Sequence, residues 1–344
     1  AAHGPRTRDM KMMKYSWRIT LAALLTCTAL VGCDDKKETL ERGASAKAEE
    51  ATSKDAKATA ADVGAAAKPE SEREEDGERL ITLGGGVTEI VFAVGKGDAV
   101  VAVDTSSTYP TERVEKLPKV GYVRKLDAEG ILSMNPTRVI TTKDAGPAVV
   151  IEQIKGAGIE VSIVPGESTI EGAKERITAI GALLDAKEPA ARVIETLERD
   201  LDRVQDHRAR VTEAPKALFI YARGPNVLMV SGAKTAADEM IRLAGAENAV
   251  TGFEQFKPLT AEAVVAAAPD VLVMPAHGAE SIGGVEGVVA LPGVAETPAG
   301  KARRLVTVDD LALLGFGPRM GEALLELQKQ MNLTDGADDD ARVH

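Results

Sequence analysis

The segment Gly121-Tyr122-Val123-Arg124 has the residue types and the spacing to bind a metal ion through oxygen. A free tyrosine has a pKa of about 10, so at neutral pH a metal and a nearby cation must stabilise the phenolate. Arg124 lies two residues on and can donate to the phenolic oxygen of Tyr122, while Gly121 permits an exposed turn. A lone tyrosine near a strand end is more often an amphipathic rim residue, and this interpretation stays open.

Other side chains could share such a site or compete for it. Tyr109 and Tyr221 are further tyrosines, and Tyr221 is followed by Arg223, but neither lies in a glycine-flanked turn with an arginine so placed. Tyr221 is expected to line the opposite wall. His277, in PAHGAES after a buried strand, is either a second ligand or a loop histidine. His207 is expected on a solvated helix surface.

The composition excludes several classes of protein. A chain of 344 residues exceeds one hydrophobic core, so we expect two domains of roughly 100–150 residues. The net charge of −11 and the pI near 5.1 disfavour a nucleic-acid partner. Two cysteines and four histidines are too few for a disulfide framework or a Cys/His zinc site.

The N-terminal segment predicts a targeting signal rather than a folded domain. Residues 1–33 comprise an extension and a signal peptide, in which the cations Lys14 and Arg18 precede a short apolar run. The tetrapeptide that ends at Cys33 resembles the lipobox of bacterial lipoproteins, which implies cleavage before this cysteine and lipidation of its thiol. Asp34 resembles the signal that keeps lipoproteins on the periplasmic side of the inner membrane.

The rest of the chain predicts an α/β protein with two lobes. Residues 34–78 are rich in Ala, Lys and Glu and predict a disordered tether, because they cannot bury enough apolar surface. Strand-like and helical runs then alternate, which predicts a mainly parallel sheet flanked by helices in each of two lobes, 79–185 and 212–334. One long bridging helix is predicted over 186–211, and residues 335–344 form an acidic tail.

The two predicted lobes contain a repeated segment. LDAEGILSMNPTRVI at 126–140 aligns without gaps with LTAEAVVAAAPDVLV at 259–273. In both copies a capping residue begins a short helix, a glutamate follows two residues later, and a proline ends the helix ahead of a buried strand. Because duplicated lobes usually enclose one cleft, we expect a small ligand between them.

The sequence resembles periplasmic haem-binding proteins of bacterial ABC importers. They form part of the helix-bridged class of substrate-binding proteins, which also includes cobalamin and siderophore binders. The resemblance covers residues 79 to 332 and rests on LGGGVTEIVFAVG, VDTSSTYP, LPKVGYVRKLDAEGIL, FKPLTAEAVVAAAPDV and LLGFGPR. GYVRKLDAEGIL is the most specific of these strings, since it separates haem binders from the wider class.

This resemblance implies roles for four residues. Tyr122 would bind the iron of ferric haem, and Arg124 would support the phenolate. Glu129 and Glu262, at equivalent positions of the repeat, would meet arginines of the permease dimer. The protein would then deliver haem as a transported ligand to an ABC permease and its ATPase in the inner membrane, without catalysing a reaction.

Two glycine-containing motifs are also expected near the ligand. The backbone amides of Gly85 and Gly86, at a predicted helix start, would approach the carboxylates or the edge of haem. Phe316, in LLGFGPR, would form an apolar wall. Arg319 is either a propionate partner or a cation at a helix start.

Three alternatives to a haem carrier remain. A binding protein with the same fold and membrane tether could carry cobalamin or a ferric siderophore. An enzyme in the cleft is disfavoured, because no nucleophile elbow, Ser/His/Asp order or close acidic pair is present in the lobes. A cytochrome-like redox or sensor protein lacks the CxxCH attachment site.

Overall fold

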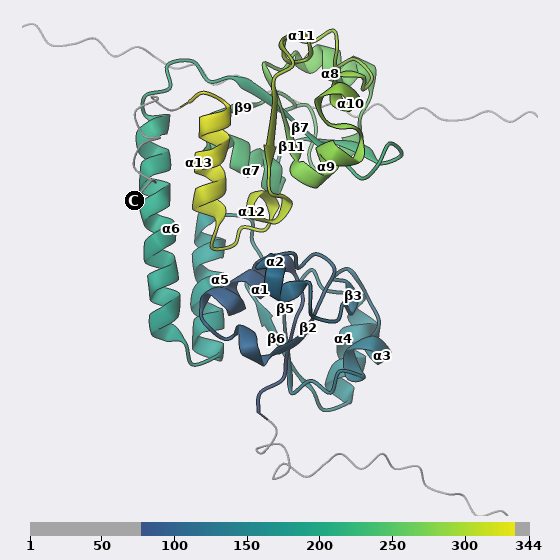
Figure 1. Ribbon diagram of the computed structural model, residues 1–344, viewed down its shortest axis with the longest axis vertical. Helices are drawn as coiled ribbons and strands as arrows, with labels where there is room; N and C mark the ends of the chain where they lie inside the picture. The colour runs from purple at the N-terminus through teal and green to yellow at the C-terminus, as the bar shows by residue number, and fades with distance from the viewer. Residues whose placement is uncertain (1–76, 334–344) are drawn as a thin grey trace, which may run out of the picture. The chain divides into compact units, whose positions relative to one another are not determined.

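The computed structural model describes residues 77–333, which form two α/β lobes joined by a long helix (Figure 1). The predicted signal peptide with Cys33, the predicted tether up to residue 76 and the predicted acidic tail lie outside the described residues. Within residues 77–333, no helix combines the length and the apolar character needed to cross a membrane.

The first lobe is built on a four-stranded sheet in which every pair of neighbours is parallel. Its strands are short and rich in Val, Ile and Thr, which favour extended backbone. The central strands β1 and β5 are buried on both faces. In spatial order the strands are β2 (Val100–Val103), β1 (Leu80–Thr82), β5 (Arg138–Thr142) and β6 (Glu160–Val164).

Helices and one small hairpin surround this sheet. The hairpin pairs β3 (Gly121–Tyr122) with β4 (Lys125–Leu126). The hydroxyl of Thr169 caps α5 by accepting a hydrogen bond from the Gly172 amide at 2.9 Å. The helices are α1 (Gly85–Ala93), α2 (Thr111–Val114), α3 (Ala128–Leu132), α4 (Ala148–Gly156) and α5 (Ile170–Leu183).

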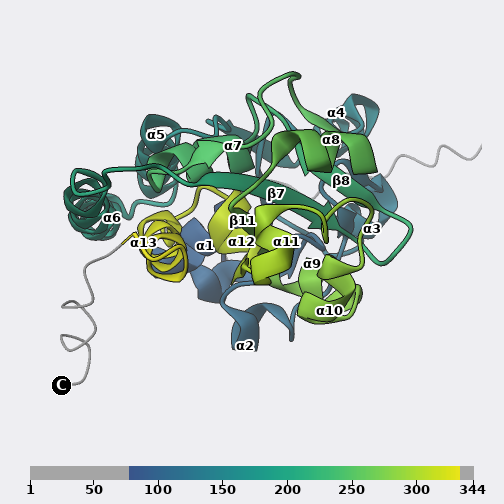
Figure 2. The same ribbon diagram turned by 90° about the horizontal axis from the view of Figure 1, so that it is seen from above.

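The bridging helix is α6 (Lys187–Arg208), which lies inside the predicted segment 186–211. Its buried apolar stripe includes Leu197, Leu201 and Val204. Figures 1 and 2 show α6 running beside α5 and beside α13 (Met320–Gln330). The predicted two-lobe α/β fold with one connecting helix is therefore confirmed.

The prediction for His207 is wrong. The side chain lies in the last turn of α6 but is only 5% exposed. Its Nδ1 atom is 3.1 Å from Oε1 of Gln328, a fully buried residue of α13. The helix surface that looks solvated in sequence is covered, because α13 comes from the far end of the chain and packs on it.

The second lobe contains a mixed sheet. Strands β9, β11 and β12 run parallel to their neighbours, whereas β8 and β10 form antiparallel pairs. Strand β9 pairs with the first residues of β7, and β8 pairs with its last residues. The strands are β7 (Lys216–Ala222), β8 (Leu228–Ser231), β9 (Glu247–Asn248), β10 (Phe256–Pro258), β11 (Val271–Pro275) and β12 (Leu305–Val308).

Short helices connect these strands, and hydroxyl or carboxylate side chains cap several of them. Thr235, Thr260 and Asp309 each accept a backbone hydrogen bond at a helix start. Besides α13, the helices are α7 (Ala236–Leu243), α8 (Ala261–Ala267), α9 (Ala276–Ser281), α10 (Gly284–Val289), α11 (Pro298–Ala302) and α12 (Asp310–Leu314).

The structure reproduces the repeat at the level of single residues. Helices α3 and α8 begin at equivalent positions of the two copies, as do strands β5 and β11. Asn135 and Ala268, which are also equivalent, both adopt left-handed backbone with φ of 47° and 42°. Both residues lie directly before the proline, although α8 continues up to this position and α3 already ends at Leu132.

One apolar cluster extends across both lobes. It contains Val87 and Ile177 of the first lobe, Leu197 of α6, and Phe219 and Leu324 of the second lobe. Two smaller clusters each belong to a single lobe. Burial of apolar area contributes about 25 cal/mol per Å², so the shared cluster stabilises the lobes against each other.

Candidate ligand-binding site

Tyr122 lies on the hairpin of β3 and β4, next to a two-residue connection. Gly121 has a φ of +98°, and a Cβ atom there would lie 3.3 Å from the carbonyl oxygen of Lys125. The position therefore favours glycine. The Tyr122 side chain is among the exposed large hydrophobic groups, with 43% of the residue accessible. Its phenol is available to a ligand.

Backbone hydrogen bonds fix the hairpin to two neighbouring loops. The amide of Thr105 donates to the carbonyl of Gly121 at 2.8 Å. Gly146 donates to the carbonyl of Val123 and accepts from the amide of Leu126, both at 2.9 Å. These loops follow β2 and β5, so Tyr122 is held at the carboxyl edge of the parallel sheet, where α/β proteins usually bind ligands.

Asp104 organises the first of these loops, and the sequence interpretation missed it. Its buried carboxylate accepts hydrogen bonds from the amides of Gly84 and Ser106, both at 2.9 Å, and from the hydroxyl of Ser107 at 2.6 Å. The network positions Thr105, which in turn holds the hairpin. In the sequence, the only indication of this network was a run of polar residues directly after a buried strand.

Arg124 has a weak partner in this structure. One of its terminal guanidinium nitrogens lies 3.8 Å from Oδ2 of Asp144, and both side chains are more than half exposed. Solvent-exposed ion pairs contribute about 0–1 kcal/mol. Arg124 can therefore leave Asp144 for a new anion at little cost, and a metal-bound phenolate two residues away would be such an anion.

Tyr221 has a different environment, although Arg223 follows it at the same spacing. It lies inside β7, where the strand neighbour Met229 pairs with it. Its ring meets that of Phe256 edge to face, with 6.5 Å between centroids. Tyr221 is half-buried, so it presents less of its ring to solvent than Tyr122 does.

The glycines of the LGGG loop are covered by the second lobe. A Cβ atom on Gly86 would lie 2.6 Å from the carbonyl oxygen of Gly315, and one on Gly85 would lie 2.5 Å from Leu311. Phe316 is 1% exposed and belongs to the shared cluster. Close packing between the lobes is sufficient to explain why glycine and phenylalanine occupy these three positions. Their contacts with a ligand stay predictions, which require the covering elements to separate.

Arg319 is engaged by protein groups from both lobes. Its Nε atom is 2.6 Å from Oε1 of Glu89, and a terminal nitrogen is 3.1 Å from Oδ1 of Asp309. The guanidinium also lies over the ring of Tyr109, 3.7 Å from the centroid. Arg319 directly precedes α13, as expected of a cation at a helix start. Its contacts also join the two lobes, a role that was not predicted from the sequence.

His277 lies at the start of α9, directly after β11. Its Nδ1 atom is 3.5 Å from Oδ1 of Asp310, the residue that begins α12 after β12. Burial raises the pKa of the Asp310 carboxyl, and His277 opposes this shift. His277 is largely exposed at a sheet edge, and its role as a second ligand stays a prediction. Across residues 77–333, no three His, Cys, Asp or Glu side chains converge to hold a metal ion.

Residues 80–312 match the family described as periplasmic binding protein. The chain belongs to this family. Among solved structures it is similar to the apo form of periplasmic heme-binding protein RhuT from Roseiflexus sp. RS-1, with 44% identity and a TM-score of 0.71. That match covers 74% of this chain and 97% of the RhuT chain.

Curated relatives include proteins of transport systems. An uncharacterized ABC transporter substrate-binding lipoprotein of Bacillus subtilis, YvrC, is 28% identical over 93% of this chain and 98% of its own length. The vitamin B12-binding protein of Yersinia pestis is 27% identical over 57% of this chain and 69% of its own length. The family and these neighbours are substrate-binding transport proteins rather than enzymes.

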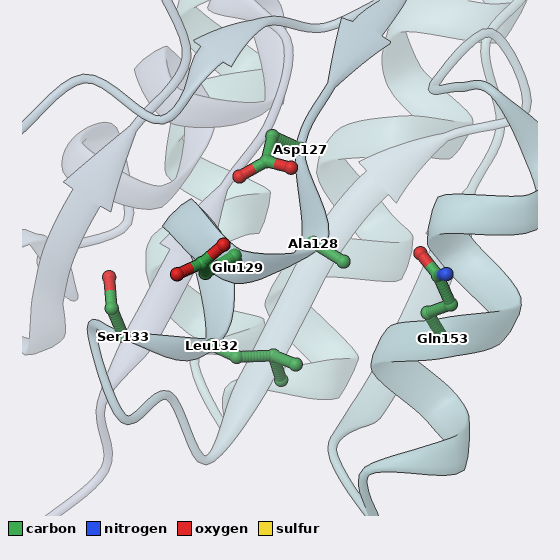
Figure 3. Close-up of a pocket in the computed structure, with 6 residues that line it drawn as sticks. All are labelled: Asp127, Ala128, Glu129, Leu132, Ser133 and Gln153. Carbon is green, nitrogen blue, oxygen red and sulfur yellow. The ribbon is translucent and has the colours of Figure 1, made fainter. Parts of the chain in front are cut away.

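In this periplasmic binding protein the repeated helices present two exposed glutamates. Glu129 lies in the first turn of α3, whose cap is formed by Asp127 accepting from the Gly130 amide at 2.8 Å. Glu262 lies in the first turn of α8, where Thr260 accepts from the Ala263 amide at 3.3 Å. Glu129 and Gln153 are among the residues that line a surface pocket of ≈ 580 Å³. Figure 3 shows these two side chains on α3 and α4.

Proposed function

We propose that this periplasmic binding protein captures ferric haem between its lobes and delivers it to an ABC permease, with the phenolate of Tyr122 as an axial ligand of the iron. The observation that carries the proposal is the exposed phenol on a hairpin that backbone hydrogen bonds fix at the carboxyl edge of the sheet. The similarity to a heme-binding protein at 44% identity supports it.

The chemistry of the hairpin suits this ligand. Ferric iron is a hard Lewis acid, and tyrosinate is one of the side chains that hold haem iron. Coordination removes the phenolic proton of Tyr122, and Arg124 can turn from Asp144 to stabilise the negative oxygen. The flat porphyrin contributes affinity separately, through burial of apolar area at about 25 cal/mol per Å².

A second candidate ligand is cobalamin, because curated relatives bind vitamin B12. A ferric siderophore is the third candidate ligand within the same class. In these cases the Tyr122 hairpin would form part of the wall of the site without bonding to iron in a porphyrin.

One spectroscopic titration separates these ligands. The purified chain is mixed with haemin, cyanocobalamin or a ferric catechol siderophore, and absorption spectra are recorded at increasing ligand. We expect a saturable Soret band with phenolate-to-iron charge-transfer bands for haemin, and no displacement of haemin by cyanocobalamin. Saturable binding of cyanocobalamin with no haemin complex would overturn the assignment.

We include the docking surface and the membrane anchor in the same proposal. Glu129 and Glu262 would meet arginines of the permease dimer, which its ATPase drives. Lipidation at Cys33 and the tether of residues 34–78 would hold the lobes on the periplasmic side of the inner membrane.

The anchor has its own test. Cys33→Ala should release the protein from the membrane fraction or leave the precursor unprocessed, because the lipid-bearing thiol is gone. Cell fractionation followed by mass spectrometry of the mature N-terminus measures both outcomes. A variant that is processed and stays in the membrane fraction like the parent would exclude a lipid on this cysteine.

A further inference from the structure

The segment of residues 315–319, which connects α12 to α13, contacts the first lobe through a buried arginine. Arg176 of α5 is only 4% exposed, and backbone carbonyls surround its guanidinium. It donates to Gly315 at 3.2 Å and to Phe316 at 3.3 Å in the second lobe. Within its own lobe it donates to Pro165 at 2.6 Å and to Glu167 at 3.1 Å. The cation therefore bridges two lobes.

The same segment ends in a second bridge. Arg319 pairs with Glu89 of α1, whose side chain is 2% exposed. Oε1 of Glu89 receives the hydrogen bond, whereas its Oε2 atom is buried without a partner. Desolvation raises the pKa of Glu89, and Arg319 opposes the shift. Breaking a buried pair leaves an uncompensated charge, which is strongly destabilising.

The backbones at this contact are fitted to each other by glycines. A Cβ atom on Gly86 would lie 2.6 Å from the carbonyl oxygen of Gly315, and one on Gly317 would lie 2.8 Å from Oε2 of Glu89. Side chains at either position would push the lobes apart. The two glycine motifs, LGGG and LLGFGPR, therefore pack directly against each other.

We propose that residues 83–86 and 315–319 are the two halves of one interlobe joint, which fixes the angle between the lobes before any ligand binds. Arg176 and Arg319 are positioning residues of this joint. Separation of the lobes would strip Arg176 of two acceptors and Glu89 of its cation, so the joined state is favoured. The joint also fixes the spacing of Glu129 and Glu262, whatever ligand the protein carries.

A distance measurement between the lobes tests the joint. Spin labels are attached at Val149→Cys in α4 and Val265→Cys in α8, which are 61% and 47% exposed. The full chain also carries Cys27→Ser and Cys33→Ser, so the two introduced cysteines are its only thiols. Electron–electron double resonance of the ligand-free protein should give one narrow distance distribution.

The variants should change that distribution in a defined way. Arg176→Met and Arg319→Met should broaden or shift it, and Arg319→Lys should restore part of the parental shape because it keeps a cation near Glu89. The matched control is Arg113→Met, since Arg113 pairs with the exposed Asp98 inside the first lobe at 2.5 Å. The control should keep the parental distribution.

Two outcomes would overturn the joint. One is a broad or multiple distribution in the parent, and the other is a parental distribution in both folded arginine variants. If circular dichroism shows that the arginine variants do not fold, Gly86→Ala decides, because it adds only a methyl group against Gly315. A shifted distance then supports the joint, and an unchanged distance contradicts it.

Discussion

The two lobes contain the same triplet, a tyrosine followed two residues later by an arginine, in different settings. Tyr122-Val123-Arg124 closes a hairpin at the edge of the first lobe, and its phenol is exposed. Tyr221-Ala222-Arg223 ends the central strand β7, and its ring is half-buried against Phe256. Equal spacing therefore does not produce equal surroundings, because the neighbouring strands decide how much of each tyrosine ring is exposed.

The repeated helices show the opposite behaviour. Helices α3 and α8 begin at equivalent positions, each with a capping side chain and an exposed glutamate in the first turn. A helix start depends on a few neighbouring residues, so duplication preserves it. The tyrosine environments depend on more distant parts of the chain, because Tyr122 lies in a separate two-stranded hairpin and Tyr221 lies inside a mixed sheet.

The largest effect is expected from substitutions in the repeated helices α3 and α8, where the two lobes are alike. Reversal of both charges in Glu129→Lys/Glu262→Lys should abolish haem uptake, because the proposed docking places both carboxylates against permease arginines, which lysines would repel. Haemin binding by the purified variant should persist. Haem-dependent growth of cells that contain the cognate permease measures uptake, and Glu195→Lys/Glu213→Lys is the control of equal charge change. Unchanged uptake in the first variant would refute the docking role.

The next effect contrasts the two tyrosines. Tyr122→Phe should lose the phenolate-to-iron charge-transfer band and weaken ferric haem binding by about tenfold or more, which corresponds to about 1.4 kcal/mol. Tyr221→Phe removes the tyrosine hydroxyl of the second-lobe triplet and should keep the band. Absorption spectra and haemin titrations measure both. A parental spectrum in Tyr122→Phe would exclude this ligand and direct attention to His277 and Tyr221.

A smaller effect is expected at the arginines. Arg124→Ala should retain the charge-transfer band but weaken haemin binding by about fivefold, because one charge-assisted hydrogen bond to the phenolate is worth about 1 kcal/mol at an exposed position. Arg223→Ala should bind haemin like the parent. Equal losses in the two variants would show that general positive charge, rather than the hairpin, attracts the ligand.

The smallest effects concern the capping residues of the repeat. Asp127→Ala should lower the free energy of unfolding by about 1 kcal/mol, since the N-cap of α3 is lost. Thr260→Ala should cost less, because its bond to the Ala263 amide is longer, 3.3 Å against 2.8 Å at Asp127. Urea unfolding of both variants measures the difference, and a larger loss at Thr260 would contradict this ranking.

The sequence by itself determined the features that depend on neighbouring residues. The alternation of strands and helices, the extent of the bridging helix and the repeat up to Pro136 and Pro269 follow from local periodicity, caps and breakers. Gly121 likewise predicted the turn at Tyr122. The positive φ of this glycine is required by a turn that involves only neighbouring residues.

Only the tertiary structure decided which polar and glycine residues meet across the lobes. Arg319 pairs with Glu89 over 230 positions of sequence, and Arg176 reaches Phe316 over 140. The helix α13 buries His207 in the same manner. No local pattern encodes such partners, since propensity and capping act over a few residues, whereas the burial of an ionic or glycine position depends on which distant element packs on it.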